Sequence, residues 1–270
     1  MQEMKLNTGA AMPVVGLGLW LMKDKQECIS AVDAAISAGY RHFDTAQRYE
    51  NEAFLGEALA ASTINREDLF VTTKIAVENM RWPVLVNTFE QSLANLRMQY
   101  VDLLLLHFPA TEWRRPAWSR MEELAQSGKA KAIGVSNYTI RHLEELLKEC
   151  TIKPAVNQVE LHVYLQQPEL LEYCNAHDIV VQAYSPLAHG YGIDNPMLIE
   201  IGKKYGKTAA QIMIKWCLQV GAVPLPKSAN VERIAQNTDV FNFELDATDM
   251  KQLASLDKNY RTAWDPTNVG

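Results

Sequence analysis

The sequence has few cysteines and no long hydrophobic segment. Its four cysteines, among 270 residues, lie far apart and include no Cys-x-x-Cys pair, which argues against a zinc site or a redox pair. We expect free thiols beside apolar residues on helices, as in cytoplasmic proteins. No stretch approaches the roughly 18 apolar residues of a membrane span. The apolar residues 10–22 contain Pro13 and lack the basic cluster and cleavage site of a signal peptide.

An excess of positive charge is also absent. The net charge of −6 disfavours a nucleic-acid or anionic-membrane partner. It does not exclude a small anionic cofactor, because such a ligand needs only a local patch of positive charge. Linkers, low-complexity segments and blocks of like charge are missing too, and 48% of the residues are hydrophobic. We therefore expect one domain spanning residues 1–270.

What the sequence does contain is a regular alternation of two kinds of segment. Short apolar or β-rich runs are each followed by a longer segment whose apolar residues recur at helical spacing. Eight such units in about 250 residues are typical of a parallel (β/α)8 TIM barrel. The eight predicted strands are residues 14–20, 40–45, 69–74, 101–107, 130–136, 155–160, 179–185 and 222–227.

The alternative α/β fold is a doubly wound sheet. That fold would place a G-x-G-x-x-G phosphate loop after the first strand, and the Gly16–Gly18 region opens no such loop. Residues 5–15 are predicted to form a hairpin ahead of the barrel, because residues 7–9 have turn chemistry. Residues 230–238 and 247–256 are predicted to form two extra helices after the eighth strand.

Polar or amphipathic side chains follow every predicted strand. Active sites of such barrels lie at the carboxyl ends of the strands. Each residue alone has an ordinary structural explanation, such as a turn cap, a solvated strand end or a buried histidine, but all eight exits carry one. The residues are Trp20, Asp44, Lys74, His107, Ser136, Asn137, Gln158, Glu160, Tyr184, Ser185, Lys227 and Ser228.

Strand periodicity brings some of these residues together. Side chains alternate between the two faces of a strand, so Lys74 shares a face with Phe70 and Thr72. His107 shares a face with Leu103 and Leu105 in the same way. If both faces point inward, Lys74 and His107 meet near the barrel axis. A buried lysine needs a carboxylate, and Asp44 on the neighbouring strand can supply one.

Tyr49 stands five residues after Asp44. A phenol has a pKa near about 10 and is a weak acid at neutral pH. A nearby ammonium favours the phenolate, so we expect Lys74 to lower the pKa of Tyr49. Asp44, Lys74 and Tyr49 would then form a chain in which Tyr49 acts as a general acid. His107 would orient the carbonyl oxygen that receives the proton.

Seven stretches together resemble the aldo-keto reductases over almost the whole chain. They are GYRHFDTAQRYENE, VTTK, LLLLHFP, GKAKAIGVSNY, NQVELHVYLQQPELLEYC, QAYSPLAHG and VPLPKSANVERIAQN. The resemblance implies a (β/α)8 barrel that transfers hydride between a nicotinamide cofactor and a carbonyl, without a metal. It also implies a catalytic tetrad of Tyr49, Asp44, Lys74 and His107.

The same resemblance implies binding sites for NADPH and for the carbonyl substrate. Ser136, Asn137 and Gln158 would bind the nicotinamide carboxamide, and Tyr184 would stack on the ring. Ser185 and Leu187 would lie along the pyrophosphate. The remaining cofactor contacts implied are Lys227, Ser228 and Arg233 for the 2′-phosphate, Gln236 and Asn237 for the adenine, and Trp20. The implied substrate pocket consists of Trp20, Tyr49, His107 and Phe108.

Some features depart from the family pattern and bear on the substrate. Arg48 beside Tyr49 is unusual, and the segments expected over the barrel mouth are short, including the tail after Leu256. We therefore expect a shallow barrel mouth that accepts many substrates. Small activated aldehydes and α-dicarbonyls should be reduced in preference to steroids. The closing YRTAWDPTNVG resembles small microbial and fungal members, and members of this size are often monomers.

Two other functions remain open at this stage. One is a cofactor-binding regulatory subunit with little turnover, because some members of the family that the chain resembles act in this way. A phosphate-handling barrel isomerase is the third reading, because KSANVER has the residues to bind a substrate phosphate. In such an isomerase, Tyr184, Asn137 and Gln158 would have no evident role.

Overall fold

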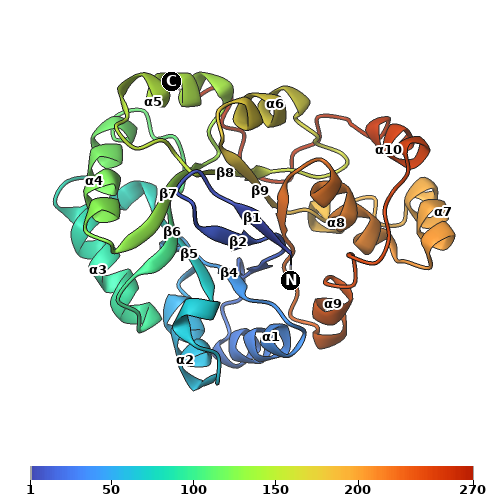
Figure 1. The fold of residues 1–270 in the computed structure, drawn as a ribbon, viewed down its shortest axis with the longest axis horizontal. Helices are drawn as coiled ribbons and strands as arrows, with labels where there is room; N and C mark the ends of the chain where they lie inside the picture. The colour runs from blue at the N-terminus through green and yellow to red at the C-terminus, as the bar shows by residue number, and fades with distance from the viewer. Residues whose placement is uncertain (1, 270) are drawn as a thin grey trace.

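The computed structural model describes residues 2–269, in which eight parallel strands form one sheet surrounded by helices (Figure 1). Each strand pairs with its neighbour in sequence, so the order never reverses and the doubly wound alternative is wrong. All eight predicted strands are present. They are β3 (Leu17–Gly18), β4 (His42–Asp44), β5 (Phe70–Ile75), β6 (Val101–Leu106), β7 (Ala130–Ser136), β8 (Val156–Glu160), β9 (Val180–Tyr184) and β10 (Val223–Leu225).

The first and last strands meet through backbone hydrogen bonds. Gly16 N donates to Pro224 O and Gly18 N donates to Pro226 O, each at 3.1 Å. A Cβ atom at Gly18 would lie 2.9 Å from the Leu225 carbonyl oxygen. Glycine is therefore required where these two strands approach, and the sheet closes into a barrel.

Helices form the outer layer of the molecule (Figure 1). They are α1 (Lys25–Ser37), α2 (Glu52–Ala61), α3 (Val84–Leu96), α4 (Arg114–Gln126), α5 (Ile140–Glu149), α6 (Pro168–Ala176), α7 (Pro196–Tyr205), α8 (Ala209–Gln219), α9 (Val231–Gln236) and α10 (Ala247–Ala254). Short 3-10 turns are η1 (Gln47–Tyr49), η2 (Arg66–Asp68), η3 (Val77–Asn79) and η4 (Ala188–Gly190). The predicted helices at 230–238 and 247–256 correspond to α9 and α10.

Helix α7 was not predicted. It begins at a capping Asn195, whose side chain accepts a hydrogen bond from Met197 N, and buries Leu198 and Ile201. Lys204 at its end donates to Asp246 and to Asp249 of the α10 region, at 2.5 and 2.8 Å. Helices α7 and α10 therefore lie together at one side of the barrel (Figure 1).

A hairpin of β1 (Glu3–Lys5) and β2 (Ala11–Pro13) lies across the middle of the ring of strands (Figure 1). Leu6 and Met12 of this predicted hairpin join an interior cluster with residues near the strand starts, including Phe70 and Leu103. Those apolar contacts close the amino-terminal end of the barrel. The carboxyl end, where the predicted site residues stand, has no such cover from the hairpin.

The alternation expected for β6 is confirmed. Leu103 and Leu105 belong to the interior cluster, whereas Leu104 and Leu106 pack between the strands and the helices. His107, two residues after Leu105, continues the inward face. Within residues 2–269, no helix combines the length and the apolar character that crossing a membrane requires.

Candidate functional site

A buried lysine lies at the centre of the predicted tetrad. Lys74 on β5 is fully buried, and its Nζ donates to Asp44 Oδ1 at 2.5 Å and to Thr45 O at 2.9 Å. Its third hydrogen bond goes to the Tyr49 hydroxyl at 3.2 Å. An ammonium has three protons to donate, so all of its bonding capacity is used. The predicted chain of Asp44, Lys74 and Tyr49 is therefore present as a set of contacts.

Local structure explains why these groups meet. Asp44 pairs with Thr72 in the parallel register of β4 and β5, so Lys74 lies one step further along the same face. Tyr49 ends the turn η1 that follows β4. Asn51 fixes the loop because it accepts from the Thr45 hydroxyl at 2.6 Å and donates to the carbonyls of Leu19 and Met22.

His107 faces the phenol across the mouth. The ring centroids of His107 and Tyr49 lie 5.7 Å apart in an edge-to-face arrangement. Burial lowers the pKa of His107 well below its ordinary value, and the charges of Lys74 and Arg48 lower it further. The imidazole is therefore neutral at neutral pH. Its Nδ1 is buried without a hydrogen-bond partner among residues 2–269.

The protonation of the other two titratable groups follows from opposing effects. Burial alone would lower the pKa of Lys74, but the effects of Asp44 and Tyr49 are together larger, and the pKa is raised above its ordinary value. Lys74 is therefore an ammonium at neutral pH. Burial raises the pKa of Tyr49, and the lowering by Lys74 offsets this only in part. The expectation that Lys74 brings the pKa of Tyr49 below its ordinary value is therefore wrong for this structure. Tyr49 stays protonated at neutral pH.

Amide and hydroxyl groups from β7, β8 and β9 extend the site. Gln158 Nε2 donates to Asp44 Oδ2 at 2.7 Å and to Gln182 Oε1 at 2.9 Å. Asn137 Nδ2 donates to His107 O and to Ser136 Oγ, while the hydroxyl of Tyr184 donates to Asn137 Oδ1 at 2.8 Å. The Ser136 hydroxyl donates to Gln158 O at 2.9 Å. The four predicted nicotinamide residues, Ser136, Asn137, Gln158 and Tyr184, therefore form one network.

This network fits a carboxamide. The side-chain N–H groups of Asn137 and Gln158 are already used within the protein, whereas Gln158 Oε1 accepts no hydrogen bond from any of residues 2–269. An amide oxygen is the acceptor that a carboxamide NH2 group needs. Asn137 and Ser185 both have positive φ, of 65° and 49°, which is uncommon outside glycine and concentrates at binding sites.

Trp20, Ser185 and His189 lie together at another part of the rim. Ser185 Oγ and His189 Nε2 are 2.7 Å apart, and the His189 ring meets the Trp20 ring edge-on at 5.1 Å. Leu187 next to Ser185 is half-buried. Of the predicted pyrophosphate residues, Ser185 is thus connected through His189 to Trp20, which is 43% exposed.

The predicted phosphate residues stand in the loop after β10 and on α9. Lys227 and Arg233 are exposed and form no ion pair with any of residues 2–269. Ser228 Oγ accepts from Asn230 N at 3.1 Å, and Asn230 Oδ1 caps α9. Both cationic side chains are thus available to bind an anion. Of the predicted adenine contacts, Gln236 is exposed, whereas Asn237 is buried.

A cavity of about 330 Å³ opens beside His107, and we call it the mouth pocket. Its lining residues are Arg48, Val77, Glu78, His107, Phe108 and Trp264. Two of the predicted substrate residues, His107 and Phe108, line this pocket. Tyr49 does not line it but lies beside His107. Trp20 does not line it either and contacts His189. The pocket has the size of small-molecule sites.

The position of Trp264 at the pocket was not predicted from the sequence, because the tail after Leu256 was expected to be too short to overhang the barrel mouth. Glu160, at the end of β8, holds this tail: its Oε1 accepts from Thr262 N at 2.6 Å, and its Oε2 accepts from Ala263 N at 3.1 Å. His162 Nε2 lies 3.1 Å from Glu160 Oε1. Trp264 thereby meets Phe108 edge-to-face, with ring centroids 6.3 Å apart. A lone tryptophan in a polar tail was the only sequence signal.

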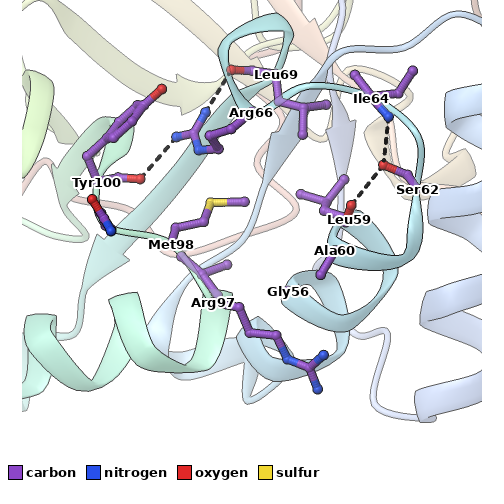
Figure 2. Close-up of a pocket in the computed structure, with 12 residues that line it drawn as sticks. Gly56, Leu59, Ala60, Ser62, Ile64, Arg66, Leu69, Arg97, Met98 and Tyr100 are labelled. Carbon is purple, nitrogen blue, oxygen red and sulfur yellow. Dashed lines mark hydrogen bonds between the residues drawn. The ribbon is translucent and has the colours of Figure 1, made fainter.

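A second cavity, of about 350 Å³, lies at the other end of the barrel (Figure 2). Its lining includes Leu69 and Tyr100, which immediately precede β5 and β6. Arg66 crosses it and donates to both of their carbonyl oxygens at 3.0 Å, as the dashed lines in Figure 2 show. Arg66 also pairs with Asp102 at 2.7 Å. This guanidinium satisfies strand-start carbonyls and has no contact with the tetrad.

Comparisons with known proteins show the family of the chain. The model of the aldo/keto reductase family matches residues 14–192 and 194–258. A glyoxal reductase of Bacillus subtilis is 42% identical over 265 residues, covering 98% of this chain and 96% of that protein.

Solved structures match the fold closely. MGS-M4, an aldo-keto reductase from a deep-sea metagenome library of the Medee basin, has a TM-score of 0.95 and 40% identity, with complete coverage of both chains. The aldo-keto reductase AKR2E5, solved in complex with NADPH, has a TM-score of 0.94 and 34% identity, covering 97% of this chain and 90% of that one. The chain belongs to the aldo/keto reductase family.

Proposed function

We propose that the protein reduces aldehyde and ketone carbonyls with NADPH and that Tyr49 is the general acid. The observation that carries this proposal is the fully buried Lys74, bonded to Asp44 at 2.5 Å and to Tyr49 at 3.2 Å at the open end of the barrel. A phenol held by an ammonium beside a neutral imidazole suits protonation of an oxygen on which negative charge develops.

The residues of the chain have separate tasks in this mechanism. A nicotinamide cofactor supplies the hydride when it is bound. Tyr49, which burial keeps protonated, donates its proton to the carbonyl oxygen, and the Lys74 ammonium stabilises the phenolate that remains. Asp44 holds the ammonium in place. His107, neutral and facing Tyr49, donates a hydrogen bond that orients the carbonyl oxygen.

NADPH is the proposed cofactor. Ser136, Asn137 and Gln158 would hold its carboxamide, because Gln158 Oε1 remains as an acceptor in their network. Tyr184 is proposed to stack on the ring, and Ser185, Leu187 and Trp20 to line the adjoining part. The remaining proposed contacts are Lys227, Ser228 and Arg233 with the 2′-phosphate, and Gln236 and Asn237 with the adenine. The structure of a relative in complex with NADPH supports this choice.

We propose small activated aldehydes and α-dicarbonyls as substrates, because a similar protein is a glyoxal reductase and the mouth pocket is small. We also propose that the chain is a single domain that acts as a monomer in the cytoplasm. Its four free cysteines fit a reducing compartment. No comparison supports the alternative of a regulatory subunit with little turnover.

The test is a panel of carbonyl compounds with purified protein, following the absorbance of NADPH. We expect methylglyoxal and nitrobenzaldehyde to be reduced with higher specificity constants than a steroid ketone. No NADPH consumption with any reactive aldehyde would favour the regulatory subunit. A steroid outperforming both small substrates would contradict the proposed substrate class and leave the reaction class intact.

A further inference from the structure

The mouth pocket combines one cation with apolar walls. Arg48 and Glu78 are its charged residues, and Val77, Phe108 and Trp264 contribute apolar surface. His107, which faces Tyr49, also lines it, so a molecule in this pocket reaches the proposed position of the reacting carbonyl. Apart from Trp20, the proposed cofactor residues come from β7 to α9, and none of them lines the mouth pocket, so the pocket remains for the substrate.

Arg48 forms an exposed ion pair with Glu78 but no hydrogen bond to it. Its Cζ lies 5.6 Å from the centroid of the Trp264 ring, a cation–π distance. Its Nε is 3.6 Å from Glu78 Oε1, which is beyond hydrogen-bond range. The two side chains are 46% and 58% exposed, and such exposed pairs contribute little.

The guanidinium consequently keeps its hydrogen-bonding capacity. No hydrogen bond of the Arg48 side chain is formed with another of residues 2–269. A planar guanidinium presents a fork of N–H donors that matches both oxygens of a carboxylate. Its position over an aromatic ring limits the rotamers that it must lose on binding an anion.

Arg48 is also close enough to the reaction centre to act on the same substrate. It immediately precedes Tyr49 in the turn η1, and its charge contributes to the lowered pKa of His107 after burial and Lys74. A substrate whose carbonyl lies between Tyr49 and His107 would therefore extend toward Arg48.

We propose that Arg48 is a specificity-determining residue that binds a carboxylate on the substrate, so the preferred carbonyl compounds carry a negative charge. This inference rests on the proposed carbonyl reduction and names its substrate class more closely. Glu78 is the competing carboxylate, since it is the anion nearest to Arg48. The ordinary alternative is a solvated arginine with no influence on substrate choice.

The test compares 4-carboxybenzaldehyde with methyl 4-formylbenzoate, which differ in charge but share the aldehyde and the ring. We expect the wild-type ratio of specificity constants, carboxylate over ester, to exceed one. Arg48→Gln should lower this ratio by about tenfold, within the range for hydrogen bonds to charged groups. The loss should appear mainly in KM, because the contact exists before and during the reaction.

Two further variants make the test two-sided. Glu78→Gln removes the competing carboxylate and should raise the ratio. Arg115→Gln removes a cation that pairs with Glu149 at 3.0 Å and does not line the mouth pocket, so the ratio should stay at the wild-type value. Added salt should lower the wild-type ratio because the contact is partly exposed.

The outcomes separate this inference from the proposed function. If both aldehydes are reduced and Arg48→Gln leaves the ratio unchanged, Arg48 does not read the carboxylate and the inference is wrong. If Arg115→Gln lowers the ratio as much as Arg48→Gln, the effect is one of net charge, and the inference is again wrong. If neither aldehyde is reduced by the wild type, the proposed function fails and the inference fails with it.

Discussion

One buried lysine organises the candidate site. An ammonium without water is costly unless its protons all find acceptors, and Lys74 finds them in Asp44, Thr45 and Tyr49. The contacts that make burial of the lysine tolerable are the same ones that fix the phenol. Tyr49 therefore has a defined position before any ligand binds, which is the condition for efficient proton transfer.

Arg233 is the residue on which the choice between the two nicotinamide cofactors is proposed to depend. Arg233→Ala should raise the KM for NADPH by about tenfold or more, because a charge-assisted contact with the 2′-phosphate is lost. The KM for NADH should change little, since that phosphate is the only difference between the cofactors. Steady-state kinetics with both cofactors provide the measurement.

The control for Arg233→Ala is Lys251→Ala. Lys251 is an exposed cation on α10, away from the proposed cofactor residues, and its loss should alter neither KM. Equal damage to NADPH and NADH use in Arg233→Ala would mean that Arg233 supports the fold.

At the scale of elements, the carboxyl-terminal tail is fastened to the barrel by a strand-end carboxylate. Burial alone would raise the pKa of Glu160, but hydrogen bonds from His162 and Thr262 outweigh burial and lower the pKa below its ordinary value. Glu160 is therefore charged at neutral pH. The bonds from Thr262 and Ala263 place Trp264 beside Phe108. The wall of the mouth pocket therefore depends on a buried acid that is not part of the tetrad.

Glu160→Gln should release this tail. The donors that now share a carboxylate would be left with a poorer acceptor, so we expect the free energy of unfolding to fall by about 1–3 kcal/mol. Limited proteolysis should cut the tail near Trp264 faster than in the wild type. Asp265→Asn is the matched control, since Asp265 lies on the same tail but contacts Arg261 and Thr267 instead of β8. An unchanged proteolysis rate in Glu160→Gln would show that the tail is held elsewhere.

At the scale of the whole molecule, the two ends of the barrel differ in how they are filled. The hairpin and an interior apolar cluster close one end, where His42 is also fully buried. The His42 Nδ1 donates to Pro13 O at 3.1 Å, and its ring packs on Phe70 with centroids 4.8 Å apart. Burial, only partly offset by that hydrogen bond, lowers the pKa of His42 to about 4.

This lowered pKa predicts a loss of stability in acid. The unfolded chain binds a proton near pH 6.5 and the folded His42 only near pH 4, so stability is lost as the pH falls through that window. Between about pH 6.5 and 5, His42 alone should cost about 2 kcal/mol. Urea unfolding should therefore show a smaller acid loss in His42→Asn than in the wild type. Above about pH 7 the pH dependence should be the same in both proteins. Equal losses of stability in acid for His42→Asn and the wild type would contradict the lowered pKa of His42.

How much the sequence could predict follows from which interactions are local. The strands and the inward positions of Lys74 and His107 follow from a two-residue period, which a sequence displays directly. Helix α7 was missed because it buries only a short stripe around Leu198 and Ile201. The position of Trp264 was missed because it depends on hydrogen bonds to Glu160, about a hundred residues away in sequence.

The direction of the pKa shift of Tyr49 was also beyond the sequence. Proximity to Lys74 could be inferred from spacing, and its lowering effect is present. The larger effect is burial, which depends on how all the surrounding elements pack and cannot be obtained from the spacing of three residues.

The most direct test of the proposed mechanism is the rate of NADPH oxidation by Tyr49→Phe. This change removes only the hydroxyl that bonds to Lys74 and keeps the ring beside His107. We predict that kcat falls by at least about 100-fold, because a general acid acts in the transition state, and that NADPH binding by fluorescence titration is unchanged. The matched control Tyr191→Phe, at an exposed ring stacked on Tyr260, should keep wild-type kcat. A fall in kcat of less than about tenfold in Tyr49→Phe would contradict the account.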